Sequence, residues 1–240
     1  MHILKIDFFI PYSIIKKRPT YNMKISLIIP TLEESKSLGK TISSVPKNSV
    51  DEIIIVDGHS KDNTVEIAKT LGCRTFLQPG KGYGNALAFG AKKAKGDIII
   101  FMDADGSHNP KVIPLLVKKI KENYDMVLAS RYLKGAGSDD DTPIRYLGNM
   151  FFTFLVNKIH KLNISDSLYL FTAIKKEAFK KINPTSNDME FCVEILIKAK
   201  KKGIKIAQVP AREPKRLGGQ SKVNVFYHGL RILFWILKKY

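Results

Sequence analysis

Residues 96–110, GDIIIFMDADGSHNP, place two aspartates at the end of a run of apolar residues. Asp103 and Asp105 are separated by one alanine, so their carboxylates are expected to lie close together at the end of a buried strand. Two such charges about 5 Å apart, at an effective dielectric near 20, repel by roughly 3 kcal/mol. Burial adds a desolvation cost for each carboxylate. The pattern therefore predicts that a cationic group binds here.

Polar side chains also follow other predicted strands. Thr31 to Glu34 come after the first strand, and Asp57 closes the second. A single carboxylate at a strand end is most often a turn or capping residue. In parallel sheets, however, ligands bind outside the carboxyl ends of the strands, and three such ends at one edge favour a binding site.

A glycine-rich segment, PGKGYGNA at residues 79–86, precedes a predicted helix. Its free backbone N–H groups and the helix dipole suit an anion. The spacing differs from that of P-loops and of dinucleotide-binding loops, so a mobile turn is an equal interpretation.

The elements that would position these residues alternate along the chain. Runs rich in β-branched residues predict strands at 25–30, 52–57, 97–103 and 125–132, with a weaker one at 74–77. Amphipathic stretches between them predict helices at 33–45, 62–72, 83–96 and 110–122. This alternation predicts an α/β fold, a mostly parallel twisted sheet flanked by helices.

Composition restricts the class of protein. A chain of 240 residues with 44% hydrophobic content suits one large domain and excludes a disordered or fibrous protein. Two cysteines exclude a disulfide framework or a zinc cluster and suit a reducing cytoplasm. The net charge of +18 favours anionic partners: nucleic acid, phosphorylated small molecules or an acidic membrane surface. The sequence has no run of about 20 apolar residues that would span a bilayer.

Residues 1–22 form an extension with interrupted apolar runs. It is either a weak interfacial anchor or an artefact of start-site assignment. The second is favoured, because a strand begins directly after Met23.

From about Lys24 to Lys222 the sequence resembles the GT-A, family 2 glycosyltransferases, in particular the polyprenyl-phosphate (dolichyl-phosphate) mannose or glucose synthases. Six elements in order carry the resemblance. They are IIPTLEE, IIIVDGHSKDNT, FMDADGSHNP, VLASRY, SDSLYLF and EPKRLGGQSK. The resemblance implies a GT-A domain at 23–222, followed by an amphipathic helix at 223–240.

The resemblance also implies the roles of particular residues. Nucleotide binding would fall to Pro30, Thr31, Glu34, Val56, Asp57, Asp103 and Ala104. Mg²⁺ or Mn²⁺ would be held by Asp103, Asp105 and Ser107. The catalytic set would be Asp105 with the phosphate-binding cations Arg131, Arg216 and Lys222. A divalent cation there turns carboxylate repulsion into attraction and neutralises the departing nucleoside diphosphate.

Some positions depart from the family pattern. Gly58 replaces the second aspartate of the family's VDD, which leaves nucleotide binding intact. Ser107 replaces a glutamine, and residues 170–172 read LFT in place of GFR. The third metal ligand and one cationic contact therefore differ from those of the mannose enzymes, and the donor or acceptor can differ too.

The acceptor determines whether a general base is needed. A phosphate monoester is already ionised at pH 7, whereas a sugar hydroxyl needs a base. Asp188 is the candidate base, although a cap of the following helix is the favoured interpretation. Glu190 and Glu194 share a face of that helix, and Glu194 is spaced to pair with Lys198.

Two amphipathic stretches bear on the acceptor. Residues 144–161 and 223–240 each carry polar side chains along one side, including His160 and His228, which are interpreted as polar-face residues and not metal ligands. Core packing is the usual role of such helices. The second stretch also carries Trp235 and ends in Lys-Lys-Tyr, as expected of an interfacial helix beside acidic lipids.

These observations together predict an inverting transferase that moves a hexose from a GDP-mannose or UDP-glucose type of donor to a polyprenyl phosphate. It would lie peripherally on the cytoplasmic face of the cell membrane. The alternative within the family is transfer to a hydroxyl of a glycan or glycolipid. A basic nucleic-acid-binding protein fits less well, because no reading motif and no aromatics interleaved with basic runs are present. A nucleotidyltransferase lacks its usual glycine-rich first loop, since PTLEE stands there.

Overall fold

The computed structural model describes residues 23–218 and 224–238. A seven-stranded sheet lies at the centre of this part of the chain, in the order β3-β2-β1-β4-β7-β5-β8. Its strands are β1 Ile25–Thr31, β2 Glu52–Asp57, β3 Arg74–Leu77, β4 Ile98–Phe101, β5 Met126–Ser130, β7 Thr172–Lys175 and β8 Ile206–Pro210. Strand β7 runs antiparallel to β4 and β5, and the other pairs are parallel. The predicted α/β fold with a mostly parallel sheet is confirmed.

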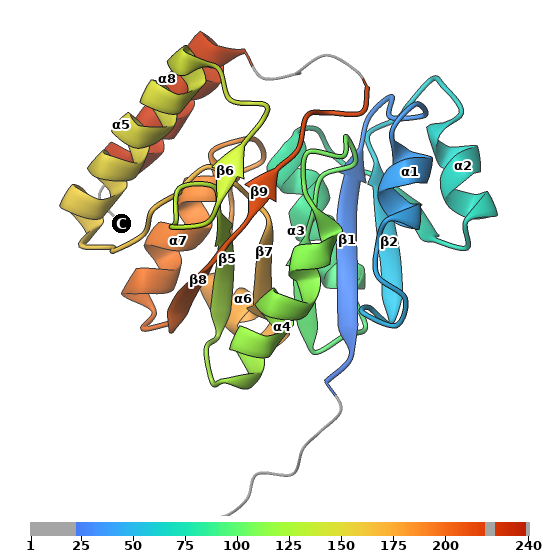
Figure 1. Cartoon of the computed structure of the whole chain (residues 1–240), viewed down its shortest axis with the longest axis horizontal. Coiled ribbons are helices and arrows are strands. Elements are labelled where there is room, and N and C mark those ends of the chain that lie inside the picture. Colours follow the sequence, from blue (N-terminus) through green and yellow to red (C-terminus); the bar gives the residue numbers. More distant parts are fainter. Residues whose placement is uncertain (1–22, 219–223, 239–240) are drawn as a thin grey trace, which may run out of the picture.

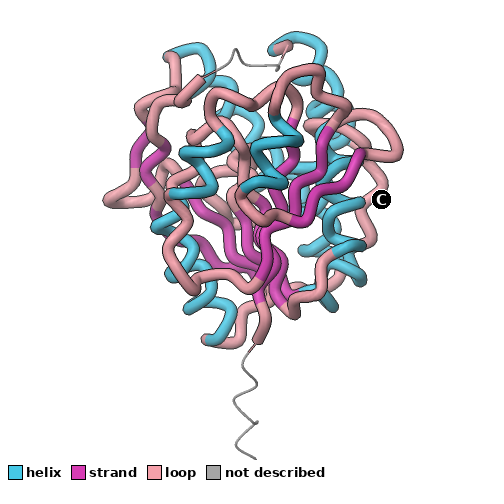
Figure 2. Tube along the Cα trace, turned by 90° about the vertical axis from the view of Figure 1, so that its right-hand side faces the viewer, coloured by secondary structure: helices cyan, strands magenta, loops and turns pink. Residues whose placement is uncertain are grey.

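Helices cover both faces of the sheet (Figures 1 and 2). They are α1 Leu38–Ser43, α2 Thr64–Thr70, α3 Tyr83–Lys93, α4 Ile113–Lys121, α5 Pro143–His160, α6 Lys176–Ile182, α7 Phe191–Lys201 and α8 Val225–Leu237. Helices α1, α2 and α4 share one buried cluster with the sheet, and α3, α5, α6, α7 and α8 share the other. Both faces of the sheet are therefore closed to water along most of its area.

The strand sequences explain this burial. In β1, Leu27, Ile28 and Ile29 are all fully buried, although consecutive side chains point to opposite faces. A continuous apolar run of this kind is typical of a parallel sheet covered on both sides. The strand predicted at 97–103 is shorter than expected, since β4 ends at Phe101. Asp103 and Asp105 consequently belong to the loop that follows it.

Strand β8 and two further parts of the fold have no counterpart among the predicted elements. Strand β7 and helix α6 follow one another directly, and β7 inserts between two strands that run the opposite way. A second, two-stranded sheet pairs β6 Gly137–Ser138 with β9 Arg212–Glu213. It ties the chain before α5 to the chain after β8. Pairing of segments so far apart in the sequence leaves no local pattern.

Helices α5 and α8 pack against each other at one end of the molecule (Figure 1). They begin and end close to the bounds predicted from the sequence. Within the described ranges, no helix is both long and apolar enough to cross a membrane.

Candidate active site

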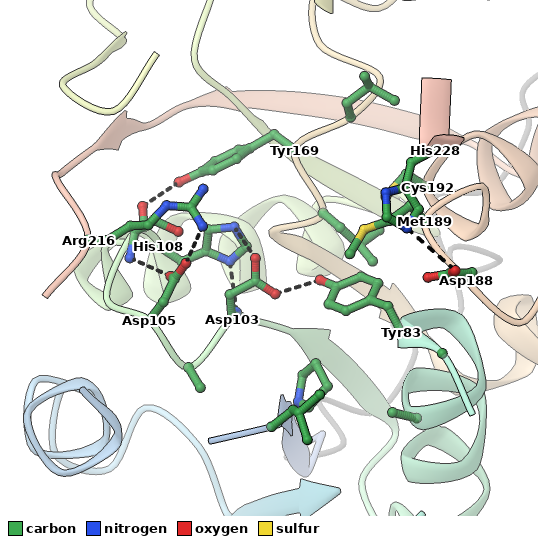
Figure 3. Close-up of a pocket in the computed structure, with 18 of the residues that line it drawn as sticks. Tyr83, Asp103, Asp105, His108, Tyr169, Asp188, Met189, Cys192, Arg216 and His228 are labelled. Carbon is green, nitrogen blue, oxygen red and sulfur yellow. Dashed lines mark hydrogen bonds and ion pairs between the residues drawn. The ribbon is translucent and has the colours of Figure 1, made fainter. Parts of the chain in front are cut away.

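A cavity of about 800 Å³ opens at the edge of the sheet where β1 and β4 end, and α5 and α8 wall its other side (Figure 3). It brings together residues that lie far apart in the sequence. The predicted site residues that line it are Pro30, Thr31, Glu34, Asp103, Ala104, Asp105, Ser107, Arg131 and Arg216.

Two predicted residues, Val56 and Asp57, do not line the cavity, and a third is not described. The side chain of Val56 is buried in the core. Asp57 is buried beneath the cavity, where its carboxylate accepts hydrogen bonds from the Thr31 hydroxyl (2.9 Å) and from the N–H of Ser60 (2.8 Å). It thus holds the loops after β1 and β2 together. Lys222 lies outside the described residues.

Asp103 is held by two neighbours (Figure 3). The Tyr83 hydroxyl donates to its Oδ1 at 2.5 Å, and its own N–H donates to Nδ1 of His108 at 3.0 Å. The His108 ring stacks on Phe171, with 5.1 Å between centroids, so its position is set by the core. Burial raises the pKa of Asp103, the like charge of Asp105 adds to this, and the neighbouring His108 opposes it.

Asp105 is tied to the segment after β9. Its Oδ1 accepts the N–H of Ser107 at 2.9 Å, and its Oδ2 lies 3.2 Å from Nη1 of Arg216. The backbone between the two contacts turns at Gly106, whose φ of +83° favours glycine. A Cβ there would also lie 2.6 Å from the Leu217 side chain. The turn therefore places the loop that carries Asp103 and Asp105 next to Arg216.

The two carboxylates suit a hard divalent cation. Both line one cavity, and the pKa of Asp103 is raised by burial and by the like charge of Asp105, although Arg216 opposes this. Across the described residues, no group of three or more His, Cys, Asp and Glu side chains is placed to hold a metal ion. Further ligands would come from phosphate oxygens and water, as is usual for Mg²⁺.

Arg131 is mostly engaged within the protein. Its side chain is 8% exposed and makes a bidentate pair with Asp166, with Nε to Oδ2 at 2.8 Å and Nη2 to Oδ1 at 3.0 Å. A third contact joins Nη1 to Oε2 of Glu213 at 3.3 Å. Its contact with a phosphate stays a prediction, and its observed contacts join the end of β5 to β9.

Arg216 lies among carboxylates and a second arginine that the sequence analysis did not single out. Its Nε donates to Oδ2 of Asp140 at 2.9 Å, and the same oxygen accepts from Nη1 of Arg145 at 3.2 Å. Asp140 and Arg145 both line the cavity. The run of three aspartates at 139–141, beside a basic helix start, is the signal in the sequence that marks this cluster.

Asp188 also lines the cavity, on the side away from Asp105 (Figure 3). Its carboxylate lies 3.6 Å from Nε2 of His228. The expected helix cap is wrong: α7 has Glu190 at its N-cap, and only the backbone carbonyl of Asp188 accepts from the helix. The predicted pair of Glu194 with Lys198 is confirmed at 2.5 Å.

Glu190 fixes α8 against α7. Its side chain is 1% exposed and lies 2.5 Å from Nη2 of Arg231. This contact and the pair of Asp188 and His228 hold α8 in place, so that His228 faces the cavity. The interpretation of His228 as a polar-face residue therefore holds, and this face points inward.

Helix α5 is oriented in the same way. Asn149 donates to the Tyr132 hydroxyl at 2.8 Å, Asn157 donates to the carbonyl of Ile164 at 2.7 Å, and His160 contacts the carbonyl of Ile236 at 2.8 Å. Most large apolar side chains of both helices are exposed, although Val156, Ile232 and Ile236 are buried. The exposed ones are Ile144, Tyr146, Leu147, Phe151, Phe154, Ile159, Val225, Phe226, Tyr227, Leu230, Phe234 and Leu237, here called the outer apolar face, and two of them, Ile144 and Val225, also border the cavity. Surface helices of soluble proteins normally show the opposite arrangement.

Comparison with known proteins agrees with this geometry. The sequence profile of Glycosyl transferase family 2 matches residues 26–183. An uncharacterized protein of Methanocaldococcus jannaschii is 33% identical over 89% of this chain and 91% of its own length. A dolichol-phosphate mannosyltransferase of Pyrococcus furiosus is 32% identical over 89% of this chain, which spans 64% of that enzyme.

The fold of this chain is similar to that of solved structures. Glucosyl-3-phosphoglycerate synthase of Mycobacterium tuberculosis, crystallised with Mn²⁺, UDP and glucosyl-3-phosphoglycerate, superposes with a TM-score of 0.72 at 20% identity, covering 90% of this chain and 79% of that one. The same enzyme was also crystallised with Mg²⁺ and UDP.

Proposed function

The chain belongs to glycosyl transferase family 2, and on that premise we propose that it transfers a hexose, with inversion, from a nucleotide sugar to the phosphate of a polyprenyl phosphate. One observation carries the choice of acceptor. Helices α5 and α8 line the cavity with the polar residues Arg145, Asn149 and His228 and with apolar ones such as Phe152 and Ile232, and most of their other large apolar side chains are exposed. An acceptor with a charged head and an apolar chain matches that combination.

The reaction needs no general base. A phosphate monoester oxygen, already ionised at neutral pH, attacks C1 of the sugar from the side opposite the leaving group. The bond between C1 and the diphosphate oxygen breaks, and its electron pair leaves with the nucleoside diphosphate. Inversion at C1 follows from this single displacement.

The donor would occupy the side of the cavity next to β1 and β4. Pro30, Thr31 and Glu34 would contact the nucleoside, beside Ala104. Asp103 and Asp105 would hold Mg²⁺ or Mn²⁺, which when bound neutralises charge on the diphosphate. The solved relatives that contain UDP with either ion support this assignment.

The protein would act at the cytoplasmic surface of a membrane. The outer apolar face gathers exposed large apolar side chains on two helices that pack together, and large exposed apolar patches mark membrane or protein interaction sites. The net charge of +18 adds attraction to anionic lipids. The name of the Pyrococcus furiosus relative also supports a lipid-linked acceptor.

A second candidate is transfer to a hydroxyl. Asp188 faces the cavity and contacts His228, an arrangement that would suit a general base held in place by a histidine. The name of the solved glucosyl-3-phosphoglycerate synthase fits a small phosphorylated acceptor.

The first experiment incubates the purified chain with labelled GDP-mannose, UDP-glucose or UDP-GlcNAc, a short polyprenyl phosphate and Mg²⁺ or Mn²⁺. Transfer of label from one donor into an organic-soluble product that mild acid cleaves is expected. Donor binding with no labelled lipid would contradict the lipid acceptor.

The Asp188→Asn variant separates the two candidates. A phosphate acceptor predicts that turnover changes little, because no base is required. Loss of turnover with unchanged donor binding would favour the hydroxyl acceptor.

A further inference from the structure

Three consecutive aspartates between β6 and α5 have three different sets of partners, although Asp140 and Asp141 both line the cavity. Asp139 forms a surface pair with Arg212, with Oδ1 to Nη2 at 2.5 Å, and does not line the cavity. Asp141 accepts from the Tyr132 hydroxyl at 2.6 Å. Asp140 lies between them and faces the cavity with its side chain 17% exposed.

The partners of Asp140 are two arginines from distant parts of the chain. Arg145 lies in the first turn of α5, and Arg216 follows β9. Both donate to the same oxygen, Oδ2 of Asp140, at 3.2 Å and 2.9 Å. The carboxylate is thus the atom group that holds the two guanidinium groups side by side.

The contact with Asp140 does not occupy all the N–H donors of either arginine. A guanidinium has five N–H donors, and the contacts of Arg145 and Arg216 with Asp140 use one each. Arg216 also contacts Asp105 through Nη1. Side-chain exposures of 34% for Arg145 and 27% for Arg216 leave both accessible from the cavity.

Without a carboxylate, two guanidinium groups this close would move apart. At about 5 Å and an effective dielectric near 20 they repel by roughly 3 kcal/mol. A phosphate monoester offers three oxygens and suits two planar arginine forks at once. We propose that Asp140 is a positioning residue that holds Arg145 and Arg216 as a clamp for the phosphate monoester group of the acceptor.

The position of the clamp favours binding of the acceptor phosphate. Arg145 belongs to α5, which walls the acceptor side, whereas Arg216 reaches Asp105 on the donor side. A phosphate held between them would lie next to the departing diphosphate. The inference rests on the proposed function in one respect: it takes the acceptor to carry a phosphate monoester.

Asp140 can affect phosphate binding in two ways, and the two predict opposite changes in affinity when its charge is removed. If Asp140 positions the arginines, Asp140→Asn weakens phosphate binding. If it acts on the phosphate only through its negative charge, the same change relieves repulsion and tightens binding. The sign of the change therefore tests the proposal.

The experiment titrates citronellyl phosphate, a short prenyl phosphate, into the full chain by calorimetry, with citronellol as the reference for apolar binding. We expect Asp140→Asn to raise the Kd about 10-fold, as for loss of a hydrogen bond to a charged group. The KM for the same acceptor should rise more than kcat falls, and Asp140→Glu should recover part of the affinity. An unchanged or lower Kd would overturn the proposal.

Asp139→Asn is the matched control. It removes the same charge one residue away, from a surface pair outside the cavity. It should leave the Kd within 2-fold of the wild type, a margin of about 0.4 kcal/mol. If both variants weaken binding equally, the effect is one of net charge and the proposal fails.

A second probe separates this inference from the proposed function. 3-Phosphoglycerate carries a phosphate monoester without an apolar chain. If only this probe binds the wild type, and Asp140→Asn weakens it, the clamp stands and the lipid acceptor is wrong. If neither probe binds the wild type, the clamp is wrong even where the chain transfers sugar to a hydroxyl.

Discussion

The proposed donor side and the proposed acceptor side of the cavity are built by different means. On the donor side, the polar residues follow strands of the sheet, and buried partners such as Asp57 and His108 hold them. On the acceptor side, the wall includes α5, α8 and the segment before α5 that carries Asp140. Ion pairs join these pieces, including Glu190 with Arg231 and Asp140 with Arg145.

The difference concerns what stabilises each half. The donor half rests on two buried apolar clusters on either side of a sheet. Helices α5 and α8 contribute Val156, Ile232 and Ile236 to one of these clusters, but most of their large apolar side chains remain exposed. Apolar burial is the main source of stability in most helices, so this half gives up stability in exchange for an outward apolar surface.

The largest expected effect lies on the donor side. Asp105→Asn should lower kcat about 10³-fold, because loss of a metal ligand removes several kcal/mol of charge stabilisation. Steady-state turnover with Mn²⁺ checks this, and binding of the variant to lipid vesicles should not change. A variant that keeps metal-dependent transfer would remove Asp105 from the site.

An intermediate effect is expected on the outer apolar face. Leu230, 69% exposed on α8, should insert into lipid, so Leu230→Ser should weaken binding to anionic vesicles about 10-fold. Leu77→Ser is the matched control, since Leu77 is 59% exposed at the end of β3, on the donor side. Sedimentation with vesicles measures both.

Two outcomes for the leucine variants would contradict the expected contact of the outer apolar face with lipid. Equal losses would mean that vesicle binding has no preferred face. Unchanged vesicle binding, with a wild type that elutes as a dimer and a Leu230→Ser variant that elutes as a monomer, would assign the outer apolar face to a second copy of this chain.

The smallest effect concerns pH. Because the pKa of Asp103 is raised in the folded metal-free protein, mainly by burial, the folded state holds this proton more tightly than the unfolded chain does. The stability contributed by that proton is present below the unfolded pKa of about 3.9 and is lost as the pH rises through the folded pKa. Asp103→Asn should therefore raise the Tm of the metal-free protein at pH 7, and the gain should shrink towards pH 5.

Thermal unfolding of the metal-free chain at both pH values measures this difference, with Asp139→Asn as the control. A lower Tm for Asp103→Asn at pH 7 would mean that the contacts of Asp103 with Tyr83 and His108 outweigh its burial cost.

Much of the donor side was predictable from the sequence. The strands β2 and β3 have the predicted bounds, because short β-branched runs between turn residues have few alternatives. Asp103 and Asp105 stood out because buried carboxylates need a partner. Val56 was carried over from the family motif, but its side chain belongs to the core.

The acceptor side was decided by the tertiary structure. The sequence by itself determined that α5 and α8 are amphipathic, but periodicity shows only that a helix has two faces and not which one the fold covers. Asp139, Asp140 and Asp141 are identical in chemistry, and only the approach of Arg212, Arg145, Arg216 and Tyr132 from elsewhere in the chain gives each a different partner. Such choices depend on contacts between residues far apart in sequence, which no local pattern records.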